Sequence, residues 1–348
     1  MSSGMVTVTL VTFNSGRYIA QCLKSVLEQD YPRTEVIVVD NASTDGTPTI
    51  LRDFERRVRV VYNRDNLGFA AGQNQAIELS EAEWVLALNP DVRLMPDFIS
   101  MAVAAGEVDP KVGSVCGKLL RMSADCEIPH EQILDSTGIY FTPAMRHLDR
   151  GSQERDDGRY GDVEYVFGAS GAAALYRRAM IQDISISGEF FDSDFFAYRE
   201  DADVAWRAQL LGWKCLYTPL SVGYHVRTVL ATNRRSLAPV LNMHSVKNRW
   251  LMRIKNMTAD LYQRYWFPAT LRDAAVIAGC LMHEFTSLRA FPFVVHNLRR
   301  FLEKRRHIMA RRRTTDSYMA AWFSTKPVSY PAPRIAPEAA EKQRLALR

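Results

Sequence analysis

Short apolar segments alternate with helical segments along the first third of the chain, and this alternation constrains the fold more than any other feature. Four segments rich in β-branched, aliphatic or aromatic residues are predicted strands: Val6–Phe13, Glu35–Val39, Arg59–Tyr62 and Trp84–Leu88. The intervals between them repeat apolar residues at helical spacing. Because such alternation forms βαβ units, the pattern predicts a parallel sheet with right-handed crossovers.

Two of these strands are followed closely by carboxylates. Asp40 follows the second strand, and Trp84–Leu88 is followed by Asn89, Pro90 and Asp91. Pro90 lacks a backbone N–H and ends the strand, which leaves Asp91 near the edge where open α/β sheets bind ligands. Asn-Pro-Asp is also an ordinary turn sequence, so this segment alone leaves Asp91 as either a turn residue or a metal ligand.

The absence of two phosphate-binding motifs narrows the class of ligand. No GxGxxG follows Phe13 and no Walker A sequence occurs, so neither nicotinamide nor P-loop chemistry is supported. A carboxylate at a strand end can instead accept hydrogen bonds from a base or ribose, while a second one anchors a cation that bridges two phosphates. Mg²⁺ or Mn²⁺ suits that role because both prefer oxygen ligands and need few protein groups. The sequence therefore favours a nucleotide bound near Asp40 and Asp91.

The middle of the chain supplies a third carboxylate. Periodicity fades between Gly117 and Gly161, where we expect hairpins or long loops. A helix is predicted from Arg199 to Leu211, and Asp201 in its first turn shares the inward, apolar face. Acids in a first turn also complement the helix dipole, which accounts well for Glu200 and Asp203 but less well for an inward-facing Asp201.

His225 ends a short predicted strand, Val222–His225, and lies between apolar residues. A lone histidine in this setting is more often a hydrogen-bonded core residue than a metal ligand. It becomes a candidate ligand only if the fold places Asp91 beside it.

The last third of the chain is predicted to be helical and holds many of the basic residues. A helix from Phe293 to about Arg313 has an apolar arc, while most of its Lys and Arg residues lie elsewhere. Such a helix either lies on an anionic membrane surface or packs on the rest of the protein or on a second subunit. No nucleic-acid-binding module accompanies the charge. The apolar arc consists of Leu298, Phe301, Leu302, Ile308 and Met309.

Cysteine usage and the N-terminus indicate the compartment. The five cysteines of this 348-residue chain are scattered and never form a CxxC pair, which argues against a disulfide framework or a zinc site and fits a reducing cytosol. The N-terminus has no secretory signal, and no apolar run of about 18 residues predicts a spanning helix.

Together these segments resemble the family 2 glycosyltransferases of the GT-A fold, in the branch that contains many bacterial rhamnosyltransferases. The matching motifs occur in the family's order over the first two thirds of the chain. They are Val11–Asn14, Val38–Thr47, Asn66–Asn74, Asn89–Asp91, Phe167–Ala172, Glu200–Asp203 and His225.

The resemblance implies a role for each matched residue. Asp40 would bind the base, Asp91 would occupy the metal-binding position of the family's DxD motif, and His225 would complete the coordination of Mg²⁺ or Mn²⁺. Asp201 would be the catalytic base. The other residues expected at the donor are Thr12, Phe13, Asn14, Asn41, Gly68, Gly72, Asn74 and Asn89, and those expected to shape the acceptor site are Gly171, Glu200 and Trp206.

The implied reaction is transfer of a sugar from a nucleotide sugar to a hydroxyl group with inversion. The Asn-Pro-Asp form favours dTDP-rhamnose as donor by analogy with that branch, although Asn89 replaces the first acid of DxD and leaves fewer charges for a metal. The implied acceptor is a glycan or a polyprenyl-diphosphate-linked glycan. Alternatives are another hexose from a UDP- or GDP-sugar, an inactive GT-A binding protein, or a nucleotidyltransferase on a related sheet.

The expected organisation is a GT-A domain over residues 1–230, a helical region over residues 231–325 and a flexible tail over residues 326–348. The donor half would cover residues 1–117 and the acceptor half residues 118–230. We expect a cytoplasmic enzyme at the inner face of the cell membrane, with a homo-oligomer as the alternative use of the basic helix.

Overall fold

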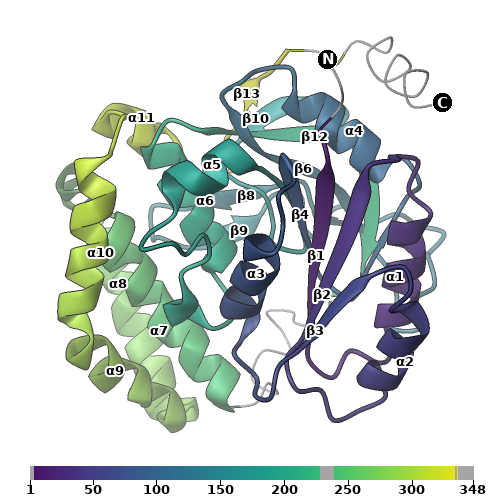
Figure 1. The fold of residues 1–348 in the computed structure, drawn as a ribbon. Helices are drawn as coiled ribbons and strands as arrows, with labels where there is room; N and C mark the ends of the chain where they lie inside the picture. Colours follow the sequence, from purple (N-terminus) through teal and green to yellow (C-terminus); the bar gives the residue numbers. More distant parts are fainter. Residues whose placement is uncertain (1–3, 228–238, 334, 336–348) are drawn as a thin grey trace.

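The computed structural model describes residues 4–227, 239–333 and 335 and has a central mixed sheet with helices on both faces (Figure 1). The strands are β1 Val6–Thr12, β2 Thr34–Asp40, β3 Arg59–Tyr62, β4 Trp84–Leu88, β5 Val92–Leu94, β6 Val112–Arg121, β7 Leu134–Ser136, β8 Ile139–Phe141, β9 His147–Asp149, β10 Glu164–Val166, β11 Ala173–Arg177, β12 Lys214–His225 and β13 Tyr330–Pro331. The helices of the first two thirds are α1 Ile19–Leu27, α2 Thr47–Phe54, α3 Phe69–Glu78, α4 Phe98–Gly106, α5 Arg178–Ile184, the 3₁₀ turn η1 Ser193–Phe195 and α6 Glu200–Leu210. The C-terminal helices are α7 Pro239–Asn256, α8 Ala259–His283, η3 Phe285–Arg289, α9 Ala290–His296, α10 Leu298–Ala310 and α11 Asp316–Ala321.

The strands lie in the order β13-β10-β12-β6-β11-β4-β1-β2-β3, with β5 beside β12 and β7 beside β6. The pairs β4–β1, β1–β2 and β2–β3 are parallel, as predicted. β11 runs antiparallel to both β4 and β6, and β6 is parallel to β12. The carboxyl ends of β1, β2, β4 and β12 therefore open on one edge of the sheet.

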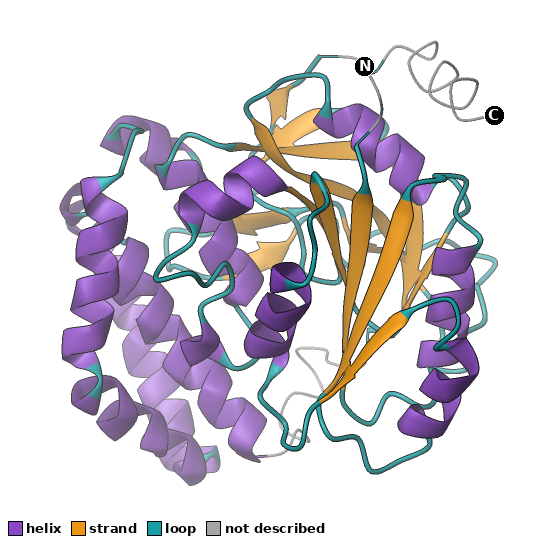
Figure 2. Cartoon of the chain, in the orientation of Figure 1, coloured by secondary structure: helices purple, strands orange, loops and turns teal. Residues whose placement is uncertain are grey.

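Strand β4 shows why its sequence is an unbroken apolar run. Trp84, Leu86 and Leu88 belong to the core cluster that includes α1 and α4, whereas Val85 and Ala87 belong to the cluster that includes α5 and α6. A strand covered on both faces needs apolar residues at every position. Figure 2 shows the two helical layers on either side of the sheet and the C-terminal helices gathered on one flank.

Most predicted elements of the first third are confirmed within one or two residues, and the largest difference is at α3. The Asn- and Gly-rich sequence from Asn63 predicts a loop up to Asn74, where a helix should begin, but α3 begins at Phe69 and includes half of that segment. One other expectation was wrong, and one element was missed. The sequence predicts two short strands, Lys214–Tyr217 and Val222–His225, but they form one strand, β12, with an irregularity between them. Helix α5 was not predicted.

The C-terminal third is helical, as predicted, but its helices are divided differently. Pro268 predicts a break between two helices, but α8 continues through it with a kink at Tyr265. The long basic helix expected from Phe293 is divided into α9 and α10. Part of the predicted flexible tail forms β13, which pairs with β10. The predicted tail beyond 335 lies outside the described residues.

Of the two uses predicted for the basic helix, the structure shows the packed one. Phe301 and Ile308 are buried, and Lys304 of α10 pairs with Asp192 and Asp194 at 2.6 and 2.7 Å. Leu298 and Leu302 remain exposed. Among the described residues, no helix combines the length and the apolar character required to cross a membrane.

Candidate functional site

The nucleotide end of the candidate site forms where β1 and β2 end side by side. Thr12 and Asp40 are partners in the parallel register, and the Thr12 hydroxyl donates to Asp40 Oδ1 at 2.8 Å. Ser43 donates its hydroxyl to the same oxygen at 2.6 Å and its backbone N–H to Oδ2 at 3.1 Å. A carboxylate oxygen has two lone pairs, so Oδ2 can accept a further hydrogen bond, for example from a base.

Phe13 and Asn14 follow β1 at the surface, with Phe13 49% exposed. Asn14 adopts a positive φ of 51°, and its side chain accepts the Thr44 backbone N–H at 2.8 Å. Its own backbone N–H donates to the Ser43 hydroxyl at 2.9 Å. These bonds join the loops after β1 and β2 and leave the Phe13 ring available for contact with a ligand.

The two glycines predicted to approach the donor lie against protein groups. Gly68 precedes α3 with φ +85°, and a Cβ there would be 2.5 Å from Phe196 Cδ2. A Cβ on Gly72 would be 2.9 Å from Val11 Cγ1. Asn41 donates its amide to the Gly68 carbonyl at 3.0 Å. In this structure the glycines allow α3 to pack closely on β1 and on the segment around Phe196.

Two other predicted residues lie away from an open site. The Asn74 amide donates to the Phe191 carbonyl at 2.6 Å and accepts the Phe191 N–H at 2.9 Å, so this side chain holds the aromatic loop. Trp206 is completely buried and packs on Phe141 and Phe323, with ring centroids 5.0 and 5.1 Å away. Because the core encloses Trp206, its ring can shape an acceptor site only through the residues that pack around it.

The candidate metal ligands Asp91 and His225 are brought together, as the sequence required. β5 and β12 pair His225 with Val92, and His225 Nε2 lies 3.4 Å from Asp91 Oδ1. This oxygen is buried and makes no hydrogen bond. On the other side of the ring, Nδ1 lies 2.8 Å from Asp135 Oδ2. A carboxylate behind a histidine fixes the ring for metal binding, so these residues fit a cation that has two protein ligands.

The two carboxylates also govern the protonation of His225. Burial disfavours the charged imidazolium, but the hydrogen bond to Asp135 and the nearby carboxylate of Asp91 outweigh it and raise the pKa of His225 to about 9. The ring lies between these two carboxylates, and a divalent cation bound by Asp91 and His225 would require Nε2 to release its proton. The described residues contain no group of three or more His, Cys, Asp or Glu side chains that could hold a metal by themselves. Phosphate oxygens of the donor would have to supply further ligands.

Asp201 lies in the first turn of α6 and is held by backbone N–H groups. Gly171 donates to Oδ2 at 2.9 Å, and Ala202 donates to Oδ1 at 2.7 Å. The next residue of the small turn, Ala172, accepts the Asn89 N–H at 2.9 Å. A Cβ on Gly171 would lie 3.2 Å from Asp201 Cβ, so a side chain there would crowd Asp201. The turn therefore connects Asp201 to the Asn89–Asp91 segment.

The electrostatics of α6 favour proton uptake by its first carboxylates. Burial raises the pKa of Asp201 above its ordinary value, against the two N–H donors, which lower it. Burial and the neighbouring Asp201 raise the pKa of Glu200 to about 8. Glu200 is buried, and its Oε2 makes no hydrogen bond. Of the two, Asp201 is partly exposed and is the carboxylate that a ligand can reach.

The segment before α6 has an unusual backbone that the sequence did not reveal. Phe196, Tyr198 and Arg199 all have positive φ, at 64°, 70° and 72°. Asn248 of α7 is completely buried and donates its amide to the carbonyls of Phe195, Ala197 and Tyr198 at 2.7–2.9 Å. This one side chain thus holds the turn from which Asp201 is presented. The sequence predicts that Asn248 lies in a helix, but it does not predict these contacts.

A buried charged cluster holds the same region from behind. Asp203 of α6 accepts from Arg207 at 2.8 Å and from Asn256 at 2.7 Å, and it pairs with Lys255 at 3.0 Å. Lys255 also contacts Asp192. These side chains are almost completely buried, so the C-terminal helices are joined to α6 through paired charges.

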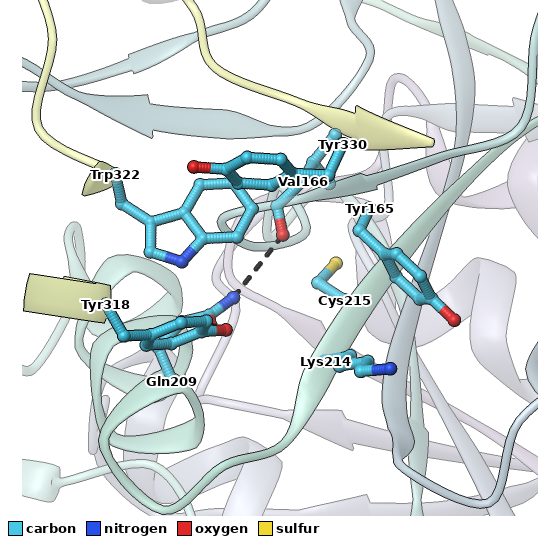
Figure 3. Close-up of a pocket in the computed structure, with 8 residues that line it drawn as sticks. All are labelled: Tyr165, Val166, Gln209, Lys214, Cys215, Tyr318, Trp322 and Tyr330. Atoms are coloured by element: carbon cyan, nitrogen blue, oxygen red, sulfur yellow. Dashed lines mark hydrogen bonds between the residues drawn. The ribbon is translucent and has the colours of Figure 1, made fainter. Parts of the chain in front are cut away.

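A separate small cavity of about 180 Å³ opens at the other end of α6 (Figure 3). Gln209, Tyr318 and Trp322 line it, and Gln209 donates toward the Val166 carbonyl at 3.4 Å. None of the predicted site residues lines this cavity.

Comparisons with known proteins agree with this arrangement. Residues 7–185 match the family model described as "Glycosyl transferase family 2". An N-acetylglucosaminyl-diphospho-decaprenol L-rhamnosyltransferase of Mycobacterium tuberculosis is 27% identical over 240 residues, which cover 64% of this chain and 76% of that protein. The putative teichuronic acid biosynthesis glycosyltransferase TuaG of Bacillus subtilis is 38% identical over 96 residues, 27% of this chain and 38% of that protein. The chain thus matches little more than a third of the length of TuaG.

Two solved structures share the fold. The mannosyltransferase PcManGT of Pyrobaculum calidifontis, in complex with GDP-Man and Mn²⁺, is 18% identical with a TM-score of 0.50, and the match covers 88% of this chain and 86% of that one. The 1–349 structure of S. aureus TarS is 17% identical with a TM-score of 0.52, covering 88% and 90%. The predicted GT-A fold with a helical C-terminal part is confirmed.

Proposed function

This chain belongs to glycosyl transferase family 2, and we propose that it transfers L-rhamnose from dTDP-rhamnose, with inversion, to a lipid-linked glycan. The family makes the chain a glycosyltransferase that uses a nucleotide sugar. One observation carries the mechanistic part of the proposal. Asp201 is held by the Gly171 N–H, and the adjacent Ala172 is bonded to Asn89, so a base and a diphosphate-binding segment share one turn.

In this mechanism Asp201 accepts the proton of the acceptor hydroxyl while the acceptor oxygen attacks the anomeric carbon. The bond from that carbon to the diphosphate oxygen breaks on the opposite face, which inverts the configuration and releases the nucleoside diphosphate. Two N–H donors fix both carboxylate oxygens of Asp201, and partial burial raises its pKa and thereby its basicity.

Asp91 and His225 would hold Mg²⁺ or Mn²⁺ together with the donor diphosphate. The buried, unpaired Oδ1 of Asp91 supports this assignment. When bound, the cation offsets negative charge on the departing diphosphate. Asp135 would keep the His225 ring oriented.

The choice of sugar and acceptor rests on one relative. The mycobacterial relative is named as an enzyme that adds L-rhamnose to a decaprenol-linked acceptor, and its match covers about two thirds of this chain. We infer the same chemistry at the inner face of the cell membrane. A panel of dTDP-rhamnose, UDP-sugars and GDP-sugars, each with and without Mg²⁺ or Mn²⁺, tests the donor by thermal shift. A larger stabilisation by a UDP- or GDP-sugar would replace rhamnose.

Asp201→Asn tests the base. The variant keeps the shape of the side chain and should fold and bind donor, but turnover should fall by about 10²–10⁴-fold because an amide cannot take the proton. Asp157→Asn, which changes an exposed surface acid, serves as the control. Turnover retained by a folded, donor-binding Asp201→Asn protein would refute the assignment.

A further inference from the structure

Helix α8 and the turn η3 expose a row of large apolar side chains that the catalytic proposal does not use. Only three residues of α8 are buried, Leu261, Ala269 and Cys280. The exposed side chains are each between 53% and 72% accessible, far above the scattered exposure that is normal for single apolar residues. They are Trp266, Phe267, Leu271, Leu281, Met282 and Phe285, and we call them the α8 strip.

The spacing of the α8 strip shows that it faces outward as one surface. Phe267, Leu271 and Leu281 recur at intervals that return to the same side of α8, and exposed alanines at 274 and 278 continue the line between them. Phe285 follows in η3, after α8 has ended at His283. Ala269 and Cys280 lie on the opposite side, against the protein. The strip is therefore a continuous apolar face that nothing in the described part of the chain covers.

The charges beside the α8 strip are mixed, but one of the three acids is already paired. These acids are Asp260, Asp273 and Glu284, and Asp273 is paired with Arg249 and Arg253 at 2.8 and 2.5 Å. Exposed arginines precede the strip at Arg264 and follow it at Arg289. Lys and Arg also far outnumber Asp and Glu across the whole helical region from residue 239 to 313. The apolar surface therefore lies in a helical region that carries a net positive charge.

We propose that the α8 strip docks on an anionic phospholipid bilayer. Aromatic and aliphatic side chains would enter the headgroup boundary, and the bordering arginines would be attracted by anionic lipids, at about 1 kcal/mol for each charge near the surface. A second copy of the chain is the competing occupant. It would bring two positively charged regions together, and like charges across an interface oppose association.

This inference rests on the proposed function, because docking on the bilayer would bring the enzyme to an acceptor that is itself anchored in that bilayer. It also differs from the contact predicted from the sequence, which used the basic helix now seen as α10. The charged side of α10 is partly occupied internally, since Lys304 and Arg300 pair with Asp192 and Asp194. The membrane contact therefore moves to α8.

Vesicle co-sedimentation of the full-length protein tests the proposal. We expect binding to vesicles of phosphatidylcholine with phosphatidylglycerol, weaker binding to phosphatidylcholine alone, and weakening by salt. The double variant Phe267→Ser/Leu271→Ser should lower binding by about tenfold or more, because two side chains no longer insert. Ile128→Ser/Leu220→Ser, which removes exposed apolar residues elsewhere, should bind as the unchanged protein does.

Two further measurements separate the outcomes. Analytical ultracentrifugation should show that the unchanged protein and the α8 double variant have the same oligomeric state. Turnover with a soluble, short-chain acceptor should be equal in both. Vesicle binding is measured without a sugar donor, so it tests the docking even if the donor assignment fails. Absence of vesicle binding would overturn the proposal. Self-association that the double variant abolishes, without any vesicle binding, would assign the strip to a second copy.

Discussion

The nucleotide end and the catalytic end of the site are held in contrasting ways. At the nucleotide end, Thr12, Asp40 and Ser43 bond to one another within two adjacent strands and the loop that follows them. At the catalytic end, Asp201 follows a turn with three positive φ values that Asn248 holds from a helix about fifty residues further along the chain. The first end is a property of a sheet edge, and the second is assembled by packing between distant parts of the chain.

This difference changes the view of the C-terminal helices. Asn248, Lys255 and Asn256 of α7 all contact the turn before α6 or α6 itself. The helical region therefore supports the position of the base in addition to any membrane contact. A strained turn persists only where surrounding contacts over-determine it, and α7 supplies those contacts. The comparison predicts that changes in α7 affect the catalytic end and spare the nucleotide end.

The largest effect is expected for the buried charge that joins α7 to α6. Lys255→Met should lower the free energy of unfolding by about 3 kcal/mol or more, because it leaves Asp203 and Asp192 buried with one cation fewer. Urea unfolding monitored by circular dichroism measures the change. Arg299→Met removes a surface pair whose arginine is 93% exposed and should change stability by less than about 1 kcal/mol. Equal stability of the two variants would contradict the joining role of Lys255.

A smaller effect, a loss of activity through weaker handling of the donor diphosphate, is expected at the candidate metal ligand Asp91. Asp91→Asn should lower kcat/KM by about 100-fold, because the buried oxygen that faces His225 loses its charge. Calorimetric titration of a nucleoside diphosphate should show that Mn²⁺ strengthens binding to the unchanged protein and not to the variant. Asp125→Asn, at an exposed acid paired with Arg17, should leave both quantities unchanged. Cation-dependent binding that survives Asp91→Asn would exclude Asp91 as a ligand.

The same contrast explains what the sequence could predict. Strands β1 to β4 were predicted because each is a short apolar run, and the proximity of Thr12 to Asp40 follows from parallel pairing. The sequence allowed His225 as a metal ligand only if the fold placed it beside Asp91, and the pairing of β5 with β12 brings the two residues together. In these cases local pattern and sheet geometry point to the same residues.

The remaining parts of the site depend on contacts that no local pattern encodes. Asp135 lies in the stretch where periodicity fades, so nothing marked it as the partner of His225. Asn248 resembles any polar residue of a helix until the carbonyls it binds are known. Trp206 matched a family position, yet its ring is enclosed by Phe141 and Phe323. Side-chain direction and long-range packing decide these three residues.

Asn248→Ala perturbs the turn before Asp201 more selectively than Lys255→Met does, because it removes no charge. Removing the amide that binds three carbonyls should loosen the turn and lower kcat by about tenfold, while the KM for the donor stays unchanged. Asn242→Ala changes another buried asparagine of the same helix and should leave kcat near its original value. Steady-state kinetics with varied donor separates the two constants. An equal rise in donor KM would show that α7 supports the whole site rather than the position of Asp201.

The last prediction concerns the pH dependence of stability at α6. Burial and the nearby Asp201 raise the pKa of Glu200 from 4.5 to about 8. Below pH 4.5 the carboxyl group is protonated in both states. As the pH rises from there to about 8, the unfolded chain releases the proton first, so the folded state progressively loses stability.

Glu200→Gln removes this loss, and its unfolding free energy should therefore improve relative to the unchanged protein between pH 5 and about 8. Asp201 and Asp203 remain in both proteins, so their own titration largely cancels in the difference. Urea unfolding of the two proteins at several pH values measures it, with Glu131→Gln, at an exposed acid, as the control. A difference that is constant with pH would mean that Glu200 ionises in the folded state as it does in water, and that the base end of α6 is less enclosed than its contacts indicate.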